Sequence, residues 1–135
     1  MSKALVACLE DLFFRSKIDA TARHLNVPVR FTDAKNLVQT CRETETAAVF
    51  IDLSANGKPL AAVRKLRQDK ATRELPIIGF LPHVDRKLAA EAESSGVTRV
   101  LPRSQFSETL PDLVMDLLAP GTKREIPEEP ELPDE

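Results

Sequence analysis

Acidic side chains directly follow two apolar segments of this 135-residue chain, and they are its best candidates for chemistry. The apolar run 4–9 ends in Glu10 and Asp11, and the run 47–51 ends in Asp52. In a parallel sheet the carboxyl ends of neighbouring strands share one edge, where ligands usually bind. Clustered carboxylates repel one another and need a cation, and Mg²⁺ suits a few carboxylates together with water and a phosphate oxygen. The three acids are therefore a candidate metal site.

Apolar runs alternate along the chain with segments of helical periodicity. Five strands alternating with five helices imply a parallel sheet that right-handed crossovers cover on both faces, which is a three-layer α/β sandwich. The expected strands are 4–9, 27–31, 47–53, 75–81 and 97–101, and the expected helices carry apolar stripes over 14–25, 37–41, 60–66, 88–92 and 106–117.

Turn and cap residues mark where several of these elements begin and end. Pro28 lacks an N–H donor and indicates a strand at the edge of the sheet. Thr32-Asp33 offers an N-cap for the second helix, and Asp85 offers one for the fourth, which Gly96 ends. Pro111 suggests that the regular part of the last helix begins only near that residue.

Charge divides the chain into two parts. Residues 1–118 carry 17 Lys and Arg against 15 Asp and Glu, whereas residues 119–135 carry 2 against 6. The second part also holds four prolines and almost no large apolar residue, so it cannot bury enough surface to offset the entropy of ordering. We predict one folded domain, 1–118, followed by a disordered acidic, proline-rich tail, 119–135.

Composition narrows the function classes. No apolar run is long enough to cross a bilayer and the start of the chain lacks the regions of a secretory signal, so we expect a cytoplasmic protein without membrane contact. Cys8 and Cys41 lack metal-ligand spacing and are expected as small buried hydrophobic residues. The basic residues between 64 and 73 have no aromatic residue among them, which disfavours nucleic-acid binding.

Four features of residues 3–118 resemble the receiver domain of bacterial response regulators, the CheY-like domain. Glu10-Asp11 is similar to the family's acidic pair, and Asp52 to its phosphoacceptor. Residues 75–78, Leu-Pro-Ile-Ile, resemble the entry of its fourth strand, and Gly96 with the following run resembles its fifth. The resemblance implies a flavodoxin-like sheet of order 2-1-3-4-5, with the acidic pair and Asp52 as Mg²⁺ ligands. It also implies that a histidine kinase or phosphotransfer protein donates a phosphoryl group to Asp52.

The chain departs from the receiver pattern at the ends of the fourth and fifth strands. Leu81 stands where the family has a small hydroxyl residue that hydrogen-bonds the phosphoryl group. Pro102-Arg103 stands where the family has a lysine before a proline, so Arg103 is the nearest cation to contact the phosphate. Its planar fork differs from a compact ammonium, and a chain without Tyr or Trp also lacks an aromatic switch. These departures favour a divergent or pseudo-receiver that signals mainly by docking a protein.

The family's usual partner surface comprises the last helix and the fourth helix beside the fifth strand. The resemblance therefore implies that a kinase, a phosphotransfer protein or a downstream effector docks there, and that the chain is not itself an enzyme. The candidate residues, which we expect to be exposed, are Arg86, Lys87, Arg99, Arg103 and Gln105.

Three alternatives remain open at this point. The chain could be a pseudo-receiver that works without phosphorylation. A small α/β nucleotide-binding enzyme could use the same crevice, but it predicts a glycine-rich first turn, and this turn is Glu10-Asp11-Leu12. An anti-sigma-antagonist-like domain is suggested by the likeness of residues 50–54 to that family's strand, and it would need Ser54 to open a helix.

Overall fold

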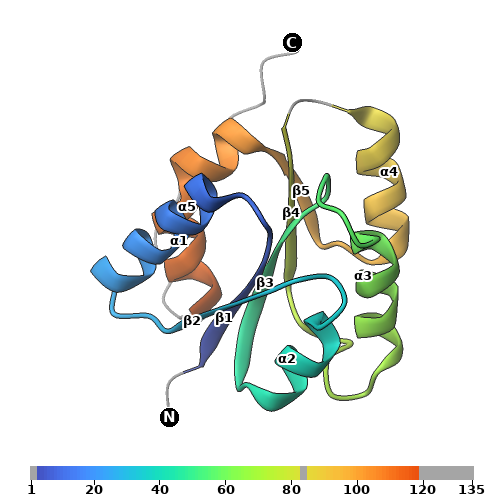
Figure 1. The fold of residues 1–135 in the computed structure, drawn as a ribbon, viewed down its shortest axis with the longest axis horizontal. Helices are drawn as coiled ribbons and strands as arrows, with labels where there is room; N and C mark the ends of the chain where they lie inside the picture. The colour runs from blue at the N-terminus through green and yellow to red at the C-terminus, as the bar shows by residue number, and fades with distance from the viewer. Residues whose placement is uncertain (1–2, 83–84, 119–135) are drawn as a thin grey trace.

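The computed structural model describes residues 3–82 and 85–118. These residues form a five-stranded sheet in the order β2-β1-β3-β4-β5, and every neighbouring pair of strands is parallel. The order confirms the expected CheY-like sandwich (Figure 1). The predicted tail, 119–135, lies outside the described residues. The strands are β1 (Ala4–Cys8), β2 (Val29–Thr32), β3 (Thr46–Asp52), β4 (Ile77–Leu81) and β5 (Arg99–Pro102).

Helices cover both faces of this sheet. In Figure 1, α1 and α5 lie on one side, and α2, α3 and α4 lie on the other. Each side has its own apolar cluster, because alternate residues of a strand point to opposite faces: Leu5 and Ala7 join one cluster, and Val6 and Cys8 join the other. The helices are α1 (Leu12–His24), α2 (Leu37–Glu43), α3 (Pro59–Gln68), α4 (Arg86–Ser95) and α5 (Arg103–Leu118).

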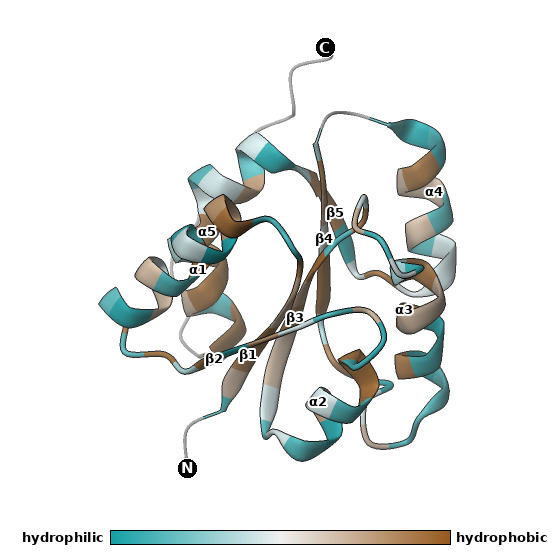
Figure 2. Cartoon of the chain, viewed as in Figure 1, coloured by the Kyte–Doolittle hydropathy of each residue, from teal (hydrophilic) through white to brown (hydrophobic). Residues whose placement is uncertain are grey.

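The three central strands are apolar almost throughout, as Figure 2 shows by their brown colour. β1 and β4 are buried along their whole length, and β3 is buried from its second residue onward. Such runs are typical of parallel strands covered on both faces. β2 lies at the edge as Pro28 predicted: Arg30 is exposed and its other three residues are only partly buried.

Two predicted element boundaries are wrong. Asp33 does not cap α2: its Oδ1 accepts hydrogen bonds from the backbone N–H and side-chain amide of Asn36, which closes a turn before the helix. Pro111 lies inside α5, which already begins at Arg103. Phe106 and Leu113, on either side of the proline, pack into the same apolar cluster, and this packing holds the helix together despite one missing hydrogen bond.

The other predicted caps are confirmed. The Asp85 carboxylate accepts a hydrogen bond from the Leu88 backbone N–H at 3.0 Å, and Gly96 ends α4 with a φ of 118°. In β4, a side chain at Gly79 would place its Cβ 2.8 Å from Leu53 Cδ1. The glycine therefore leaves room for the residue that follows Asp52.

Candidate functional site

Asp52 is the last residue of β3, and its side chain is only 7% exposed. Because β3 lies between β1 and β4, this carboxylate stands near the middle of the edge where the strands end. The segments that follow β1 and β5 bring Asp11 and Arg103 to the same place. The structure thus gathers Asp52, one further predicted acid and the predicted cation.

The two oxygens of Asp52 have different surroundings. Oδ1 accepts two hydrogen bonds from Ser54, one from the backbone N–H at 2.9 Å and one from the hydroxyl at 2.7 Å. Oδ2 lies 3.8 Å from a terminal nitrogen of Arg103. Ser54 orients the carboxylate, and Arg103 supplies an opposite charge at its second oxygen.

Arg103, the first residue of α5, reaches both acids. Its other terminal nitrogen lies 4.0 Å from Asp11 Oδ2, and its guanidinium carbon lies 4.9 Å from the centre of the Phe14 ring. Such a cation–π contact adds to the ion pairs. The Arg103 Nε is buried and has no hydrogen-bond partner among the described residues.

Asp11 serves as the N-cap of α1. Its Oδ1 accepts hydrogen bonds from the backbone N–H groups of Phe13 at 2.9 Å and Phe14 at 3.2 Å. The capping interaction leaves Oδ2 as the oxygen that contacts Arg103. Asp11 therefore both caps α1 and forms an ion pair with Arg103.

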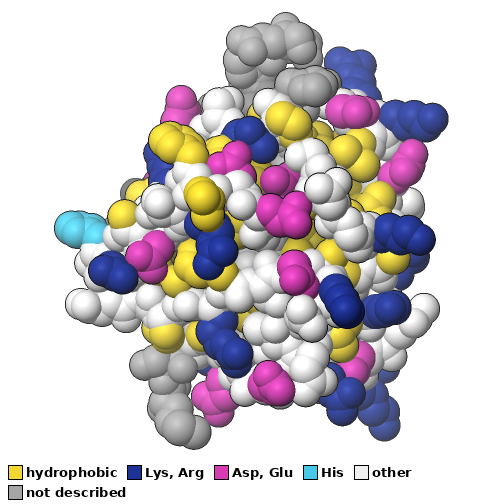
Figure 3. All heavy atoms as spheres, viewed as in Figure 1, with side chains coloured by type: hydrophobic (Ala, Val, Ile, Leu, Met, Phe, Trp, Pro, Cys, Tyr) yellow, Lys and Arg dark blue, Asp and Glu magenta, His cyan; other side chains and the backbone are white. Residues whose placement is uncertain are grey.

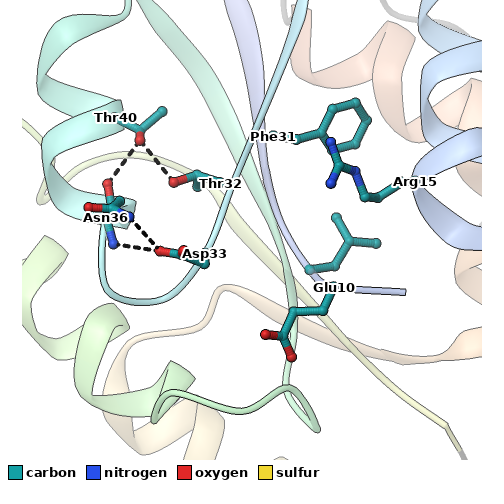
Figure 4. Close-up of a pocket in the computed structure, with 8 residues that line it drawn as sticks. Glu10, Arg15, Phe31, Thr32, Asp33, Asn36 and Thr40 are labelled. Carbon is teal, nitrogen blue, oxygen red and sulfur yellow. Dashed lines mark hydrogen bonds between the residues drawn. The ribbon is translucent and has the colours of Figure 1, made fainter. Parts of the chain in front are cut away.

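Glu10 does not complete the expected cluster of three acids. Within residues 3–82 and 85–118, no group of three or more acidic, histidine or cysteine side chains is placed to hold a metal ion. Glu10 instead lines a cavity of about 550 Å³ near the ends of β1 and β2 (Figure 4). The other residues lining this cavity are Leu9, Arg15, Phe31, Thr32, Asp33, Asn36 and Thr40.

The cavity walls are held by interactions within the chain. Arg15 lies over the Phe31 ring at 4.7 Å, and the Thr32 and Thr40 hydroxyls are 2.9 Å apart (Figure 4). Asp33 is bonded to Asn36. These polar groups therefore satisfy one another.

Leu81 ends β4 as a buried side chain, and its register partner in β5 is Pro102. Neither residue carries a side-chain hydrogen-bond donor. The position at which receivers present a hydroxyl thus presents an aliphatic side chain here.

Burial disfavours ionisation of the two thiols of the chain. Burial raises the pKa of Cys8 to about 12, and the charges of Asp33 and Asp52 act in the same direction. Burial raises the pKa of Cys41 to about 11, although a hydrogen bond with Thr46 acts the other way. Both cysteines are free and buried, as the sequence predicted.

The residues predicted for the partner surface differ in exposure. Arg86 and Lys87 are exposed on α4, while Arg99 and Arg103 are half-buried. The expectation that Gln105 is exposed is wrong, because it lies on the face of α5 that turns inward, next to the buried Phe106. Its Oε1 is buried and has no partner among the residues that the structure describes.

Lys and Arg side chains gather along the right edge of the molecule in Figure 3, over α3 and α4. Two arginines of α3 bind other segments of the chain. Arg67 donates to the backbone oxygens of Gly96, Arg73 and Leu75, and Arg64 donates to the Ser95 hydroxyl at 2.7 Å. Arg64 and Arg67 therefore have structural roles, and the absence of nucleic-acid binding stays a prediction.

Sequence reasoning missed the roles of two residues at the site. Ser54 was considered only as a helix-opening serine, yet α3 begins five residues later, at Pro59, and Ser54 bonds Asp52 instead. The requirement that Ser54 open a helix, which the anti-sigma-antagonist alternative made, is therefore not met. Phe14, part of the predicted apolar stripe over 14–25, packs in the core and also contacts the Arg103 guanidinium through its ring. The Asp-x-Ser spacing of an Asx-type turn could have indicated the first role, and no sequence signal indicated the second.

The structure also weakens the nucleotide-binding alternative. A phosphate bound at the start of α1 would need free backbone N–H groups. Those of Phe13 and Phe14 already donate to the Asp11 carboxylate.

None of the described helices has the length and apolar character needed to span a membrane.

The sequence matches no protein-family model and no curated protein sequence. Solved structures match it closely in shape. A response regulator from Chloroflexus aurantiacus superposes with a TM-score of 0.78 at 18% identity, over 88% of this chain and 99% of that one.

Two further matches agree with the first. The receiver domain of a Pseudomonas aeruginosa sensor histidine kinase, with a magnesium ion in its active-site cleft, gives a TM-score of 0.77 at 16% identity, over 88% of this chain and 99% of that one. A chemotaxis response regulator of Vibrio cholerae gives 0.76 at 15% identity, over 87% of this chain and all of the other. The chain therefore has the CheY-like fold of response-regulator receiver domains.

Proposed function

We propose that this chain is a receiver-like signalling module of the two-component or phosphorelay kind, which acts by docking a protein partner. The observation that carries the proposal is the position of Asp52. In a receiver fold, this buried carboxylate ends the central β3 strand, with one oxygen held by Ser54 and the other beside Arg103.

In this proposal Asp52 accepts a phosphoryl group from a histidine kinase or a phosphotransfer protein. Oδ2, which Ser54 leaves free, attacks the phosphorus, so that a P–O bond forms as the P–N bond of the donor phosphohistidine breaks. Arg103 then pairs with the oxygens of the transferred group, because a guanidinium presents two donors to a phosphate.

A divalent metal fits poorly among these residues. The Pseudomonas receiver holds magnesium in its cleft. Among the described residues, Glu10 does not form a metal-binding group with Asp11 and Asp52. The Oδ2 atoms of Asp11 and Asp52, which make no local hydrogen bonds, lie beside the Arg103 guanidinium. Mg²⁺ binding by the three acids stays a hypothesis, and no step of the proposal depends on it.

A second candidate is a pseudo-receiver that docks its effector without phosphorylation. Two observations favour it: Leu81 leaves no hydroxyl to respond to a phosphoryl group, and Asp52 is almost closed to an incoming donor. Leu12 and Phe13, at the start of α1, are 74% and 75% exposed, which is unusual for large apolar residues. With Arg86 and Lys87, they are the surface residues we assign to docking.

The two modes are separated by amide NMR in the presence of beryllofluoride, a phosphoryl mimic, with and without Mg²⁺. An Asp52 acceptor predicts shifts centred on Asp52 and Ser54 that the Asp52→Asn variant loses. Asp19→Asn, which removes a carboxylate from the middle of α1, should keep them. If the wild type shows no shifts at Asp52, its phosphorylation is excluded and the pseudo-receiver is favoured.

Docking is tested separately with a Leu12→Ser/Phe13→Ser variant in a pull-down from cell extract. Because both side chains are exposed, the melting temperature should stay near that of the wild type while partner capture is lost. A matched control is Ser16→Ala, an exposed residue of the same helix. Undiminished capture by the double variant would remove this surface from the proposal.

A further inference from the structure

The carboxylates of Asp11 and Asp52 share a single positive group. The two terminal nitrogens of Arg103 lie 4.0 Å from Asp11 Oδ2 and 3.8 Å from Asp52 Oδ2. Asp11 comes from the start of α1, Asp52 from the end of β3 and Arg103 from the start of α5. The guanidinium therefore bridges acids that the chain supplies from two distant segments.

The remaining acceptor capacity of the two acids is limited. Oδ1 of Asp11 caps α1, and Oδ1 of Asp52 accepts both hydrogen bonds from Ser54. Only the Oδ2 atoms are left for a cation, and these are the atoms that Arg103 contacts. A divalent ion between the two acids would have to take the same oxygens and displace the guanidinium.

Arg103 is also held from its other side. Its guanidinium lies over the Phe14 ring at 4.9 Å, and its Nε is buried. The side chain is only 30% exposed, and Phe14 packs in turn against Phe80 and Phe106 of the core. The Arg103 guanidinium thus packs on the ring of Phe14, which itself packs in the core, and does not extend into solvent.

We propose that Arg103 is the resident cation of this site and takes the place of a divalent metal between Asp11 and Asp52. The inference rests on the proposed function only in taking Asp11, Asp52 and Arg103 as the functional site. It explains why two acids can lie at one edge of the sheet without a third ligand: the guanidinium offsets their mutual repulsion, and a metal competes with it instead of adding to it.

The test is a Mg²⁺ titration followed by amide NMR, with Mn²⁺ as a paramagnetic probe, on the wild type, Arg103→Gln and Arg23→Gln. Arg23 carries the same charge on an exposed part of the far end of α1. Arg103→Gln should bind Mg²⁺ at least about tenfold more tightly than the wild type, because a unit charge near the two oxygens is removed. Mn²⁺ should broaden the Asp11, Asp52 and Ser54 signals in that variant alone, and Arg23→Gln should behave as the wild type.

Arg103→Lys is a second variant that keeps the test valid if Arg103→Gln does not fold. A lysine keeps the charge but cannot bridge two carboxylates with a planar fork, so its Mg²⁺ affinity should lie between those of the wild type and Arg103→Gln. Equal Mg²⁺ affinity in the wild type and Arg103→Gln would overturn the inference. It would also be overturned if folded Arg103→Gln bound no Mg²⁺, since something other than Arg103 would then exclude the metal.

The titration uses neither a phosphodonor nor a partner protein. The absence of a beryllofluoride response in the wild type, or undiminished partner capture by the Leu12→Ser/Phe13→Ser variant, would therefore count against the proposed function alone. An unchanged Mg²⁺ affinity in Arg103→Gln would count against the role of Arg103 alone.

Discussion

Ser54 fixes the orientation of Asp52 through two hydrogen bonds to the same carboxylate oxygen, at 2.9 and 2.7 Å. Replacing Ser54 by Ala removes the hydroxyl donor and leaves the backbone N–H. Because the acceptor is a nearly buried carboxylate, we expect the free energy of unfolding in urea to fall by about 1 kcal/mol. Ser16→Ala, on the exposed face of α1, should change it by less than about 0.5 kcal/mol. The same loss in both variants would mean that the Ser54 hydroxyl does not hold Asp52.

The two buried thiols make stability depend on pH. Burial raises the pKa of Cys8 from 9.0 to about 12 and that of Cys41 from 9.0 to about 11. Above pH 9.0 the unfolded chain loses these protons while the folded chain keeps them, so the free energy of unfolding should fall as pH rises from 9.0 towards 11 or 12. Below pH 9.0 the thiols should add no slope.

Urea denaturation at several pH values checks this expectation, with Cys8→Ala as the comparison. That variant should be less stable at every pH, but its stability should fall less steeply above pH 9.0. In the native wild type at pH 8, both thiols should resist iodoacetamide. Rapid alkylation of folded protein, or parallel pH profiles, would show that burial does not keep the thiols protonated.

Among the elements, α3 is tied to three neighbouring segments by one side chain. Arg67 donates to the Gly96 oxygen at 2.9 Å and to the Arg73 and Leu75 oxygens at 2.7 Å each. It also donates to the Thr98 hydroxyl at 3.3 Å. One guanidinium therefore links α3 to the entry of β4, the end of α4 and the segment before β5.

Replacing Arg67 by Ala should lower the free energy of unfolding by about 2–3 kcal/mol, because several backbone oxygens lose a charged donor. Lys65 lies on the same helix and is exposed, and Lys65→Ala should change the free energy by less than about 0.5 kcal/mol. Chemical denaturation of the two variants measures the difference. If both variants lost the same small free energy of unfolding, the hydrogen bonds of Arg67 would not contribute to stability.

The elements themselves were largely predictable because local patterns specify them. β3 and β4 are continuous apolar runs, which predict strands buried on both faces. Asp85 and Gly96 are residues that commonly cap helices, and they mark the two ends of α4. Prediction failed where tertiary packing overrides a local signal. Pro111 indicates a helix boundary in isolation, yet Phe106, Leu110 and Val114 anchor α5 to the sheet on both sides of it.

At the scale of the whole molecule, topology decides which site residues meet. The sequence placed Asp11 and Asp52 at strand ends, and the order β2-β1-β3 brings these ends together. It did not predict that Arg103 would bridge them or that Glu10 would line a separate cavity. Both outcomes depend on side-chain directions after a strand ends, which periodicity does not determine.

The whole molecule also offers a test of the predicted boundary at residue 118. Among the residues that the structure describes, the buried apolar side chains lie between Ala4 and Val114 and form the two clusters that cover the sheet. We expect this core to be sufficient for folding. A chain ending at Leu118 should therefore melt within about 2 °C of the full chain. It should also elute differently on ion exchange, because its 17 Lys and Arg exceed its 15 Asp and Glu whereas the full chain has a net charge of −2.

A chain ending at Asp116 is the matched control for this truncation. Leu117 and Leu118 are half-buried and pack against the cluster under α1 and α5, so their loss should cost about 2 kcal/mol and lower the melting temperature by several degrees. If the chain ending at Leu118 were destabilised as much as the one ending at Asp116, residues 119–135 would contribute to the fold. The domain would then extend into the acidic segment, and its four prolines and six acids would have to be explained as structural residues.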